Sequence, residues 1–196
     1  MLYQTKKIFN LNGQDLLLAP LDVDFAHRTI SLTGVIDEET ATVLNAALRC
    51  LARDSEEEIL LYIQSPGGSV SAGFSIYDTA KSLRCSLCTV ASGMAASMAA
   101  FLLTAAGTKG RRWCQPHAEV LLHQPLGGTS GQASDIRIHA EHILNIRGRI
   151  NRILADCTGQ TFQKIEMDTE RDKIMCAEEA LEYGLVDQIG DPISEW

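Results

Sequence analysis

Residues 58–70 read EILLYIQSPGGSV, and this stretch decides the fold. Glu58 to Ile63 is a continuous apolar run, typical of a strand that is buried on both faces of a parallel sheet. The chain then turns at residues 65–68, Ser-Pro-Gly-Gly, because Pro and Gly interrupt regular structure. Apolar residues at 70, 74, 76 and 80 predict a helix over Ser69 to Leu83. A buried strand, a turn and a helix in this order indicate an α/β fold.

The flanking sequence continues the alternation of strands and helices. Further strands are expected at residues 28–32, 86–91, 112–114, 118–122 and 185–189, and helices from about 41, from about 95 and at 177–183. Gly184 is expected to end the last helix as a left-handed residue. We therefore expect a largely parallel sheet, whose ligands gather at the carboxyl ends of its strands.

The longest helical pattern runs from Gln132 to Cys157, with apolar residues at steps of three and four. A helix of this length measures about 39 Å and would project beyond a small core. Its apolar stripe would then need a partner, which indicates oligomerisation. The alternative is an ordinary amphipathic helix that packs on its own domain.

Residues 87–106, LCTVASGMAASMAAFLLTAA, carry no charge and are long enough to span a membrane. However, they are rich in Ala, Ser and Gly, and Gly93 lies in the middle, where it can end a strand and start a helix. We expect a buried strand followed by a buried helix, and no membrane association.

Composition narrows the class of protein. The 196 residues suit one domain, or one domain with an appendage. A net charge of −8 argues against a nucleic-acid binder, because such proteins are usually basic. The first residues lack the apolar core of a secretory signal, so the six cysteines are interpreted as reduced thiols of a cytoplasmic protein.

Cys85 and Cys88 form a CxxC pair, which could act in redox chemistry or supply half of a zinc site. No second pair of this kind follows in the sequence. The simpler interpretation, which we favour, is two small residues that enter a buried strand.

Three positions carry the candidate chemistry. Ser97 lies at the start of a predicted helix, where free backbone N–H groups favour a developing oxyanion, although a lone serine in an Ala-rich helix is a weak signal. His123 follows a strand and precedes a Pro/Gly turn, which suits a general base. Gly67-Gly68 either forms a tight turn only or presents bare N–H groups to an oxyanion. The other histidines, His27, His117, His139 and His142, are expected to be surface or structural residues.

An acid that orients the imidazole would complete a triad. Residues 168–172, DTERD, offer three carboxylates, and the pattern alone does not choose between Asp168, Glu170 and Asp172. Most of this cluster is expected to be a solvated turn.

Taken together, four segments resemble the proteolytic subunit of the Clp protease, a family of serine peptidases. They are residues 62–70 (YIQSPGGSV), 93–100 (GMAASMAA), 122–128 (LHQPLGG) and 168–172 (DTERD). They occur in the family's order and at its spacing, and the resemblance covers about residues 28–190. Gln64 stands where Asn is usual.

The resemblance implies Ser97 as the nucleophile, His123 as the general base and Asp172 as the orienting acid. The backbone N–H groups of Gly68 and Met98 would form the oxyanion hole. The family uses no cofactor and no metal ion, and the subunit itself binds no nucleotide.

The resemblance also implies a crotonase-like ββα superhelix within the α/β class. Residues 28–196 would form the peptidase domain, with a projecting handle helix at about 132–157. The handle would stack two heptameric rings, homomeric or mixed, into a tetradecamer. A hexameric AAA+ unfoldase ATPase of the Clp type would dock near Tyr62 and Trp113 and feed unfolded proteins into the chamber.

Residues 1–27 depart from the family pattern. Family members carry a helix just before the segment that matches Arg28, and Pro20 is expected to interrupt that region. Leu60 also replaces a usual aromatic residue of the docking surface. Both departures suggest an atypical paralogue that works in a mixed complex with a second type of subunit.

Three other functions remain as alternatives. A catalytically silent ring subunit would lack a triad residue, whereas all three are present here. A crotonase-fold enzyme acting on acyl-thioesters shares the oxyanion hole but has no Ser–His–Asp triad. A membrane-anchored signal-peptide peptidase would need an anchor.

Overall fold

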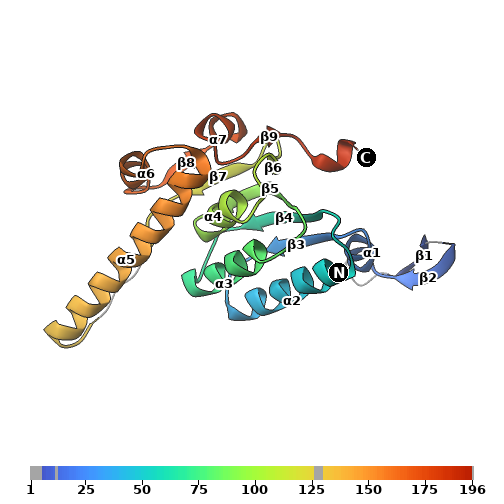
Figure 1. Cartoon of the computed structure of the whole chain (residues 1–196), viewed down its shortest axis with the longest axis horizontal. Coiled ribbons are helices and arrows are strands. Elements are labelled where there is room, and N and C mark those ends of the chain that lie inside the picture. Colours follow the sequence, from blue (N-terminus) through green and yellow to red (C-terminus); the bar gives the residue numbers. More distant parts are fainter. Residues whose placement is uncertain (1–5, 12, 126–129, 196) are drawn as a thin grey trace.

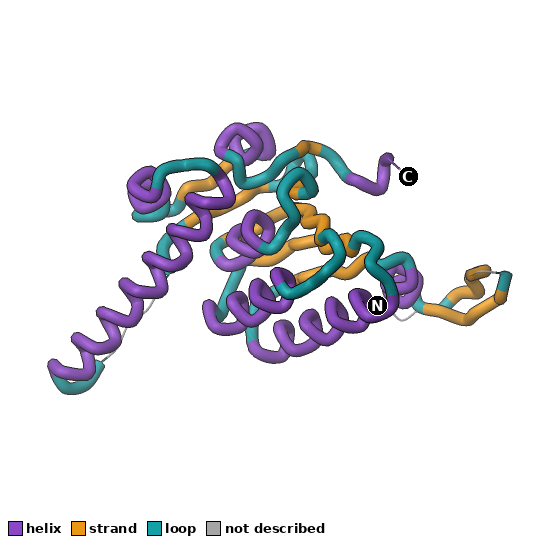
Figure 2. The backbone as a smooth tube through the Cα atoms, viewed as in Figure 1, coloured by secondary structure: helices purple, strands orange, loops and turns teal. Residues whose placement is uncertain are grey.

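The fold is that of a computed structural model, which describes residues 6–11, 13–125 and 130–195. Residues 126–128 of the LHQPLGG segment lie outside this described part. Strands and helices alternate along the chain, as expected from residues 58–70 (Figures 1 and 2).

The strands are β1 (Lys7–Leu11), β2 (Gln14–Leu18), β3 (Thr29–Thr33), β4 (Ile59–Ser65), β5 (Leu87–Ala96), β6 (Arg112–Cys114), β7 (Glu119–Leu122), β8 (Lys173–Met175) and β9 (Gln188–Ile189). The helices are α1 (Pro20–Ala26), α2 (Glu38–Asp54), α3 (Val70–Lys81), α4 (Met98–Ala105), α5 (Ala133–Thr158), α6 (Phe162–Asp168) and α7 (Ala177–Tyr183), with a final 3-10 turn η2 (Pro192–Glu195). The α/β class and the largely parallel sheet are confirmed. The strands β1, β2 and β8 and helix α6 were not foreseen.

The main sheet has the order β3-β4-β5-β6-β9, and its neighbouring strands are parallel. Strand β5 has two partners on one side, because residues 89–91 pair with β6 and residues 94–96 pair with β7. Gly93, with φ +70°, lies between the two pairings. The prediction that the strand ends near Gly93 and a helix begins near Ala95 is therefore wrong. Glycine lets the strand bend to a new partner without ending it.

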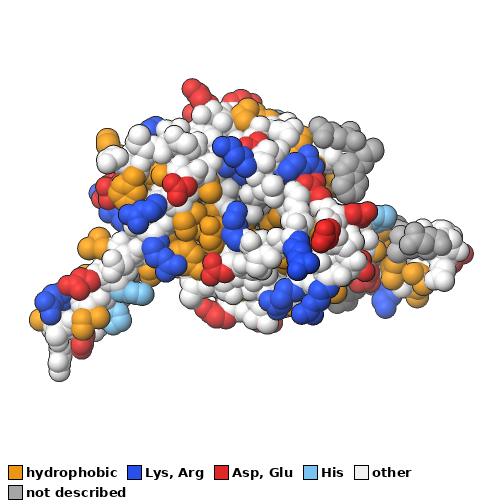
Figure 3. Space-filling model, in the orientation of Figure 1, with side chains coloured by type: hydrophobic (Ala, Val, Ile, Leu, Met, Phe, Trp, Pro, Cys, Tyr) orange, Lys and Arg blue, Asp and Glu red, His pale blue; other side chains and the backbone are white. Residues whose placement is uncertain are grey.

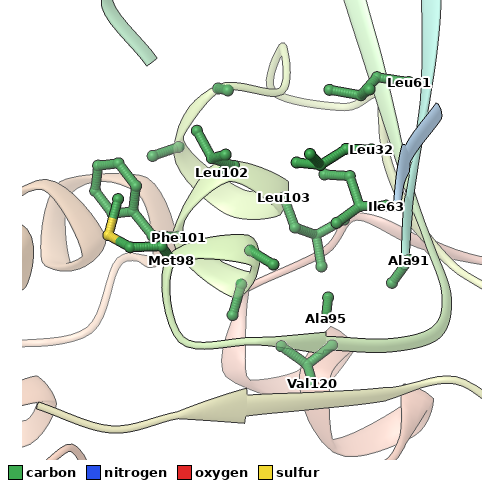
Figure 4. Packing of buried hydrophobic residues seen from close by; sticks show 14 of the residues in the cluster. Leu32, Leu61, Ile63, Ala91, Ala95, Met98, Phe101, Leu102, Leu103 and Val120 are labelled. Carbon is green, nitrogen blue, oxygen red and sulfur yellow. The ribbon is translucent and has the colours of Figure 1, made fainter. Parts of the chain in front are cut away.

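One face of the sheet carries the main core. Helices α2, α3 and α4 cover this face (Figure 1). Leu32, Leu61 and Ile63 project from the strands toward Leu102 and Leu103 of α4 (Figure 4). Helix α4 is buried along its whole length, so the apolar stretch at 87–106 is a buried strand and a buried helix, as expected. Within the described ranges, no helix combines the length and apolar character needed to cross a membrane.

Helix α2 shows how local sequence sets an element. Asp37 caps its N-terminus and accepts a 2.8 Å hydrogen bond from the Thr40 N–H. Glu38 and Glu39 lie in its first turn, where the helix dipole favours negative charge. The predicted apolar positions, Ala41, Leu44, Leu48 and Leu51, are all buried.

Pro20 does not interrupt the N-terminal region. It stands in the first turn of α1, where a proline loses no intrahelical hydrogen bond and its fixed φ suits the helix. The expectation that the helix before Arg28 is missing is therefore wrong. The preceding β1 and β2 form an antiparallel hairpin that extends from the body (Figure 1).

Helix α5 projects from the opposite side of the body, as expected for the handle (Figure 1). Only Ile150, Asn151 and Leu154, near its C-terminal end, are buried. Residues 131–142 are all exposed, and they include Ile136 and Ile138. Hydrophobic side chains also gather where the base of α5 meets the body (Figure 3).

No disulfide joins the cysteines. Cys88 is buried in β5 and Cys85 is half-buried just before it, which fits the interpretation of the CxxC pair as the entry to a buried strand. In the described part of the chain, no group of three His, Cys, Asp or Glu residues is arranged to hold a metal ion.

Candidate active site

Ser97 lies at the sharp turn between β5 and α4. Its backbone has φ 56° and ψ −122°, a combination that an L-amino acid adopts only under strain. The Ser97 N–H donates to the Leu121 carbonyl at 2.8 Å, and the Phe101 N–H donates to the Ser97 carbonyl at 3.0 Å. The hydroxyl makes no capping bond to the helix. The turn therefore leaves the Ser97 hydroxyl outside the local backbone bonding, as a nucleophile at a strand-to-helix turn requires.

Gly67 and Gly68 pass directly beside this turn. A Cβ atom on Gly67 would lie 2.7 Å from the Cβ of Ser97, and a Cβ atom on Gly68 would overlap the carbonyl of Ile36. The Ile36 N–H donates to the Gly67 carbonyl at 2.9 Å, which fixes the glycine pair in place. Only glycine fits at both positions, so bare backbone reaches the serine.

Two backbone donors are unused near Ser97. In the part of the chain that the structure describes, neither the Gly68 N–H nor the Met98 N–H has an acceptor. Met98 opens α4, and the first N–H groups of a helix have no partner within it. A Cβ on Gly67 would be 3.0 Å from the Met98 nitrogen, so the two segments converge. Such paired donors beside a serine suit an oxyanion hole.

His123 follows β7 and shares an enclosed cavity of about 20 Å³ with Ser97. The other lining residues are apolar: Val70, Met98, Phe101, Leu122, Pro125, Ile150 and Leu154. This volume holds about one water molecule. The remaining histidines, His27, His117, His139 and His142, are exposed, as expected, and do not line the cavity.

The strand pairing brings Asp172 next to His123. Strands β7 and β8 are antiparallel, and Leu122 pairs with Lys173. His123 and Asp172 occupy the next position along this register. Asp172 is exposed, and in the described part of the chain it makes no hydrogen bond or ion pair.

The two other acids of the turn have partners of their own. Glu170 accepts a 2.8 Å bond from Arg147. Asp168 accepts from the Tyr183 hydroxyl at 2.7 Å, from Lys164 at 2.9 Å and from Lys173 at 3.3 Å. Burial alone would raise the pKa of Asp168, but these hydrogen bonds outweigh it and lower the pKa below its ordinary value. Glu170, Arg171 and Asp172 are exposed, as expected for a mostly solvated turn, whereas Asp168 is largely enclosed by its partners.

The three candidate triad residues are near one another but are not bonded. Among the described residues, no hydrogen bond joins His123 to Ser97 or to Asp172. The cavity beside them is also too small for a substrate side chain. Catalytic hydrogen bonds are often long or misaligned without substrate, so this arrangement fits a resting state.

Tyr62 and Trp113, the residues expected near a docking surface, lie on the sheet face opposite the main core. With Leu60, Cys88 and Val90 they form a second, smaller hydrophobic cluster. Trp113 is only 4% exposed. The Tyr62 hydroxyl donates a 2.6 Å hydrogen bond to Asp191, and burial together with this carboxylate raises the pKa of Tyr62.

Two buried residues near the candidate site, Asn151 and Tyr183, were not predicted from the sequence. Asn151 is 1% exposed, and neither its amide nitrogen nor its amide oxygen has a partner among the described residues. Tyr183 belongs to the predicted last helix, but nothing in the sequence pattern indicates that its hydroxyl bonds Asp168. A polar residue inside the apolar stripe of α5 is the only hint that singles out Asn151.

A strained serine, a histidine that shares its cavity and a pair of unused N–H groups define the class of protein: they suit acyl transfer by a covalent nucleophile. The family model described as Clp protease matches residues 19–192. The chain therefore belongs to the Clp protease family and is a peptidase of that type. The match begins at residue 19, so it includes α1 and extends the resemblance seen from residue 28.

Proposed function

We propose that this chain is a serine endopeptidase that uses Ser97 as nucleophile, His123 as general base and Asp172 as orienting acid. The observation that carries the proposal is the strained Ser97 turn, which shares a cavity with His123 and lies beside the unused N–H groups of Gly68 and Met98. Membership of the Clp protease family supports the same assignment.

The reaction follows from these positions. His123 takes the proton from the Ser97 hydroxyl as its oxygen attacks the carbonyl carbon of the peptide bond. The N–H groups of Gly68 and Met98 donate to the oxyanion that forms. His123 then gives the proton to the leaving amine, and water hydrolyses the acyl-enzyme by the same steps. Asp172 holds the imidazole in the required tautomer and stabilises its charged form.

The apolar lining of the cavity supports a preference for apolar residues before the cleaved bond. Phe101, Ile150 and Leu154 line this cavity together with Ser97. At about 20 Å³ the cavity must widen to take it. We propose that this widening accompanies alignment of the triad.

The assembly is also part of the proposal. Helix α5 exposes Ile136, Ile138 and Leu144, at 43%, 58% and 61%, on a segment that leaves the body. This supports α5 as the handle that stacks two heptameric rings into a tetradecamer. An AAA+ unfoldase ATPase of the Clp type would dock near Tyr62 and Trp113 and supply unfolded proteins.

The test is fluorophosphonate labelling of the purified protein, with the adduct mapped by mass spectrometry and Ser97→Ala as the control. Labelling at Ser97, together with hydrolysis of apolar peptides that Ser97→Ala abolishes, is the expected result. Labelling at another residue, or full activity in Ser97→Ala, would overturn the proposal.

A second function rests on the unbonded triad. A ring subunit that becomes active only in a mixed ring would also hold His123 away from Ser97 and Asp172. In that case the chain alone resists labelling, and labelling at Ser97 appears when the second type of subunit is added. Labelling of the chain alone excludes this second function.

A further inference from the structure

The turn that carries Asp172 is closed by a cluster of four side chains, Asp168 and the three that bond it. One carboxylate oxygen of Asp168 accepts from the Tyr183 hydroxyl at 2.7 Å and from Lys164 at 2.9 Å, and the other accepts from Lys173 at 3.3 Å. The two ammonium groups also lie over the Tyr183 ring, 5.2 Å and 5.5 Å from its centre. We call these four residues the Asp168 cluster.

The cluster ties together three elements that surround the candidate acid. Lys164 and Asp168 belong to α6, Lys173 begins β8, and Tyr183 ends α7. Asp168 and Lys173 are the two ends of the turn that contains Asp172. Their contact therefore closes the turn, and Tyr183 anchors the closed turn to the body.

The same contacts decide where Asp172 lies relative to His123. Lys173 pairs with Leu122 of β7, and both candidates lie one residue further along this register. A shift of Lys173 would move Asp172 along β7 and away from the imidazole. The Asp168 side chain is 19% exposed and Lys173 is 33% exposed, so their contact is screened less than that of a surface pair, whereas Lys164 is 48% exposed.

The cluster also holds a cation that neighbours Asp172 in the sequence. Lys173 is the covalent neighbour of Asp172, and a free ammonium there would compete with the imidazole for that carboxylate. Asp168 and the Tyr183 ring instead hold the Lys173 ammonium. Asp172 is left without an ion pair among the described residues, as an acid that must orient a histidine requires.

We propose that Asp168 and Tyr183 are positioning residues of the active site, which fix the turn and hold Lys173 so that Asp172 is available to His123. This rests on the proposed function, because it takes Asp172 as the orienting acid. Asp168 thus has a defined role in the reaction without touching substrate or the reacting atoms.

The experiment measures peptide hydrolysis and the rate of fluorophosphonate labelling in Asp168→Asn and Tyr183→Phe. We expect kcat to fall about tenfold, which corresponds to about 1.4 kcal/mol, with KM unchanged, because substrate binding does not involve the cluster. Glu166→Gln is the matched control. It removes one negative charge from the same helix at an exposed position and should leave kcat unchanged.

A double-mutant cycle separates positioning from a merely structural role. If the cluster acts through Asp172, Asp168→Asn should cause no further loss in an Asp172→Asn background. Equal, multiplying losses in both backgrounds would overturn the proposal, and so would a rise in KM at constant kcat. If Asp168→Asn does not fold, Tyr183→Phe, which removes only a hydroxyl, carries the same cycle.

The outcome also distinguishes this proposal from the proposed function. Near-normal activity in Asp172→Asn would remove the acid assignment itself. An inactive Asp172→Asn beside normal Asp168→Asn and Tyr183→Phe would leave the triad in place and overturn the positioning role alone.

Discussion

Gly67 and Ser97 are so close that a Cβ atom on Gly67 would lie 2.7 Å from the Cβ of Ser97. Real Cβ atoms do not approach this closely, and neither partner is the flexible end of a long side chain. The segment that holds Gly67 and the turn that holds Ser97 therefore pack directly against each other, and this packing requires that residue 67 has no side chain.

Gly67→Ala should destabilise the fold and suppress labelling of Ser97. Overpacking costs about 1–3 kcal/mol, and the φ of +89° at Gly67 adds the penalty of a left-handed residue. Thermal unfolding and fluorophosphonate labelling measure the two effects. Gly34→Ala is the control, because Gly34 has φ +76° but nothing within 4 Å of its Cβ position. Equal losses in the two variants would show that the contact with Ser97 has no effect.

The strain at Ser97 predicts an order of stability among its variants. With φ 56°, Ser97 carries a backbone penalty of about 1–2 kcal/mol that glycine does not share. Ser97→Gly should therefore unfold at a higher temperature than Ser97→Ala, although both lack the proposed nucleophile and neither should be labelled. An Ala variant as stable as the Gly variant would contradict strain at this turn.

The elements that the sequence predicts best are those with strong periodicity and clear punctuation. The buried strand at 58–63, the capped helix after Asp37 and the helix closed by Gly184 were all located within a few residues. Each is determined by nearby residues alone: an apolar run, an N-cap aspartate, a left-handed glycine.

The misplaced boundaries have causes that lie elsewhere in the chain. Gly93 was predicted to end a strand, but residues 94–96 pair with β7, so β5 continues past it. Pro20 reads as an interruption, whereas its place in the first turn of α1 makes it compatible with a helix. In both cases the residue marks a special place in the backbone, as predicted. Whether it ends the element depends on where along the strand or helix it stands.

The candidate site shows the same division. Ser97 was singled out by its place at the start of a predicted helix and His123 by its place after a strand, and both residues line one cavity in the structure. Spacing left the choice among the acids open, and only the resemblance to the Clp family indicated Asp172. The folded chain adds that Arg147 bonds Glu170 and that Tyr183 bonds Asp168. Spacing within a five-residue cluster cannot carry this information.

Replacing Asn151 by an apolar residue is expected to stabilise the protein. The side chain is 1% exposed and both of its polar atoms lack partners among the described residues, so burial is uncompensated. Replacing a polar group by an apolar one of similar shape is then neutral or stabilising, and leucine is also the better helix former. Asn151→Leu should raise the unfolding temperature.

Asn45→Leu is the control for that experiment. Asn45 is also buried, but its amide nitrogen donates to the Ser75 hydroxyl at 2.9 Å, so its loss should lower the unfolding temperature. A fall of similar size in Asn151→Leu would show that the Asn151 amide is satisfied in solution.

The pair formed by Arg112 and Asp187 predicts how stability depends on pH. The Arg112 side chain is 4% exposed and bonds Asp187 through two nitrogens, at 2.8 Å and 2.5 Å. Burial alone would raise the pKa of Asp187, but the hydrogen bonds and charge of Arg112 outweigh it and lower the pKa below its ordinary value. The contribution of a carboxyl with a lowered pKa is fully present above its unfolded value of about 3.9 and is lost as the pH falls toward its folded value.

Asp187→Asn should therefore lower the free energy of unfolding at pH 7 by roughly 3–5 kcal/mol, because it leaves a buried arginine without its counter-charge. It should also flatten the decline in stability below about pH 4. Urea unfolding at a series of pH values measures both effects, with the exposed Asp156→Asn as the charge-matched control. If the free energy of unfolding of the variant falls with pH as steeply as that of the unmodified protein, Asp187 contributes nothing to the loss of stability in acid.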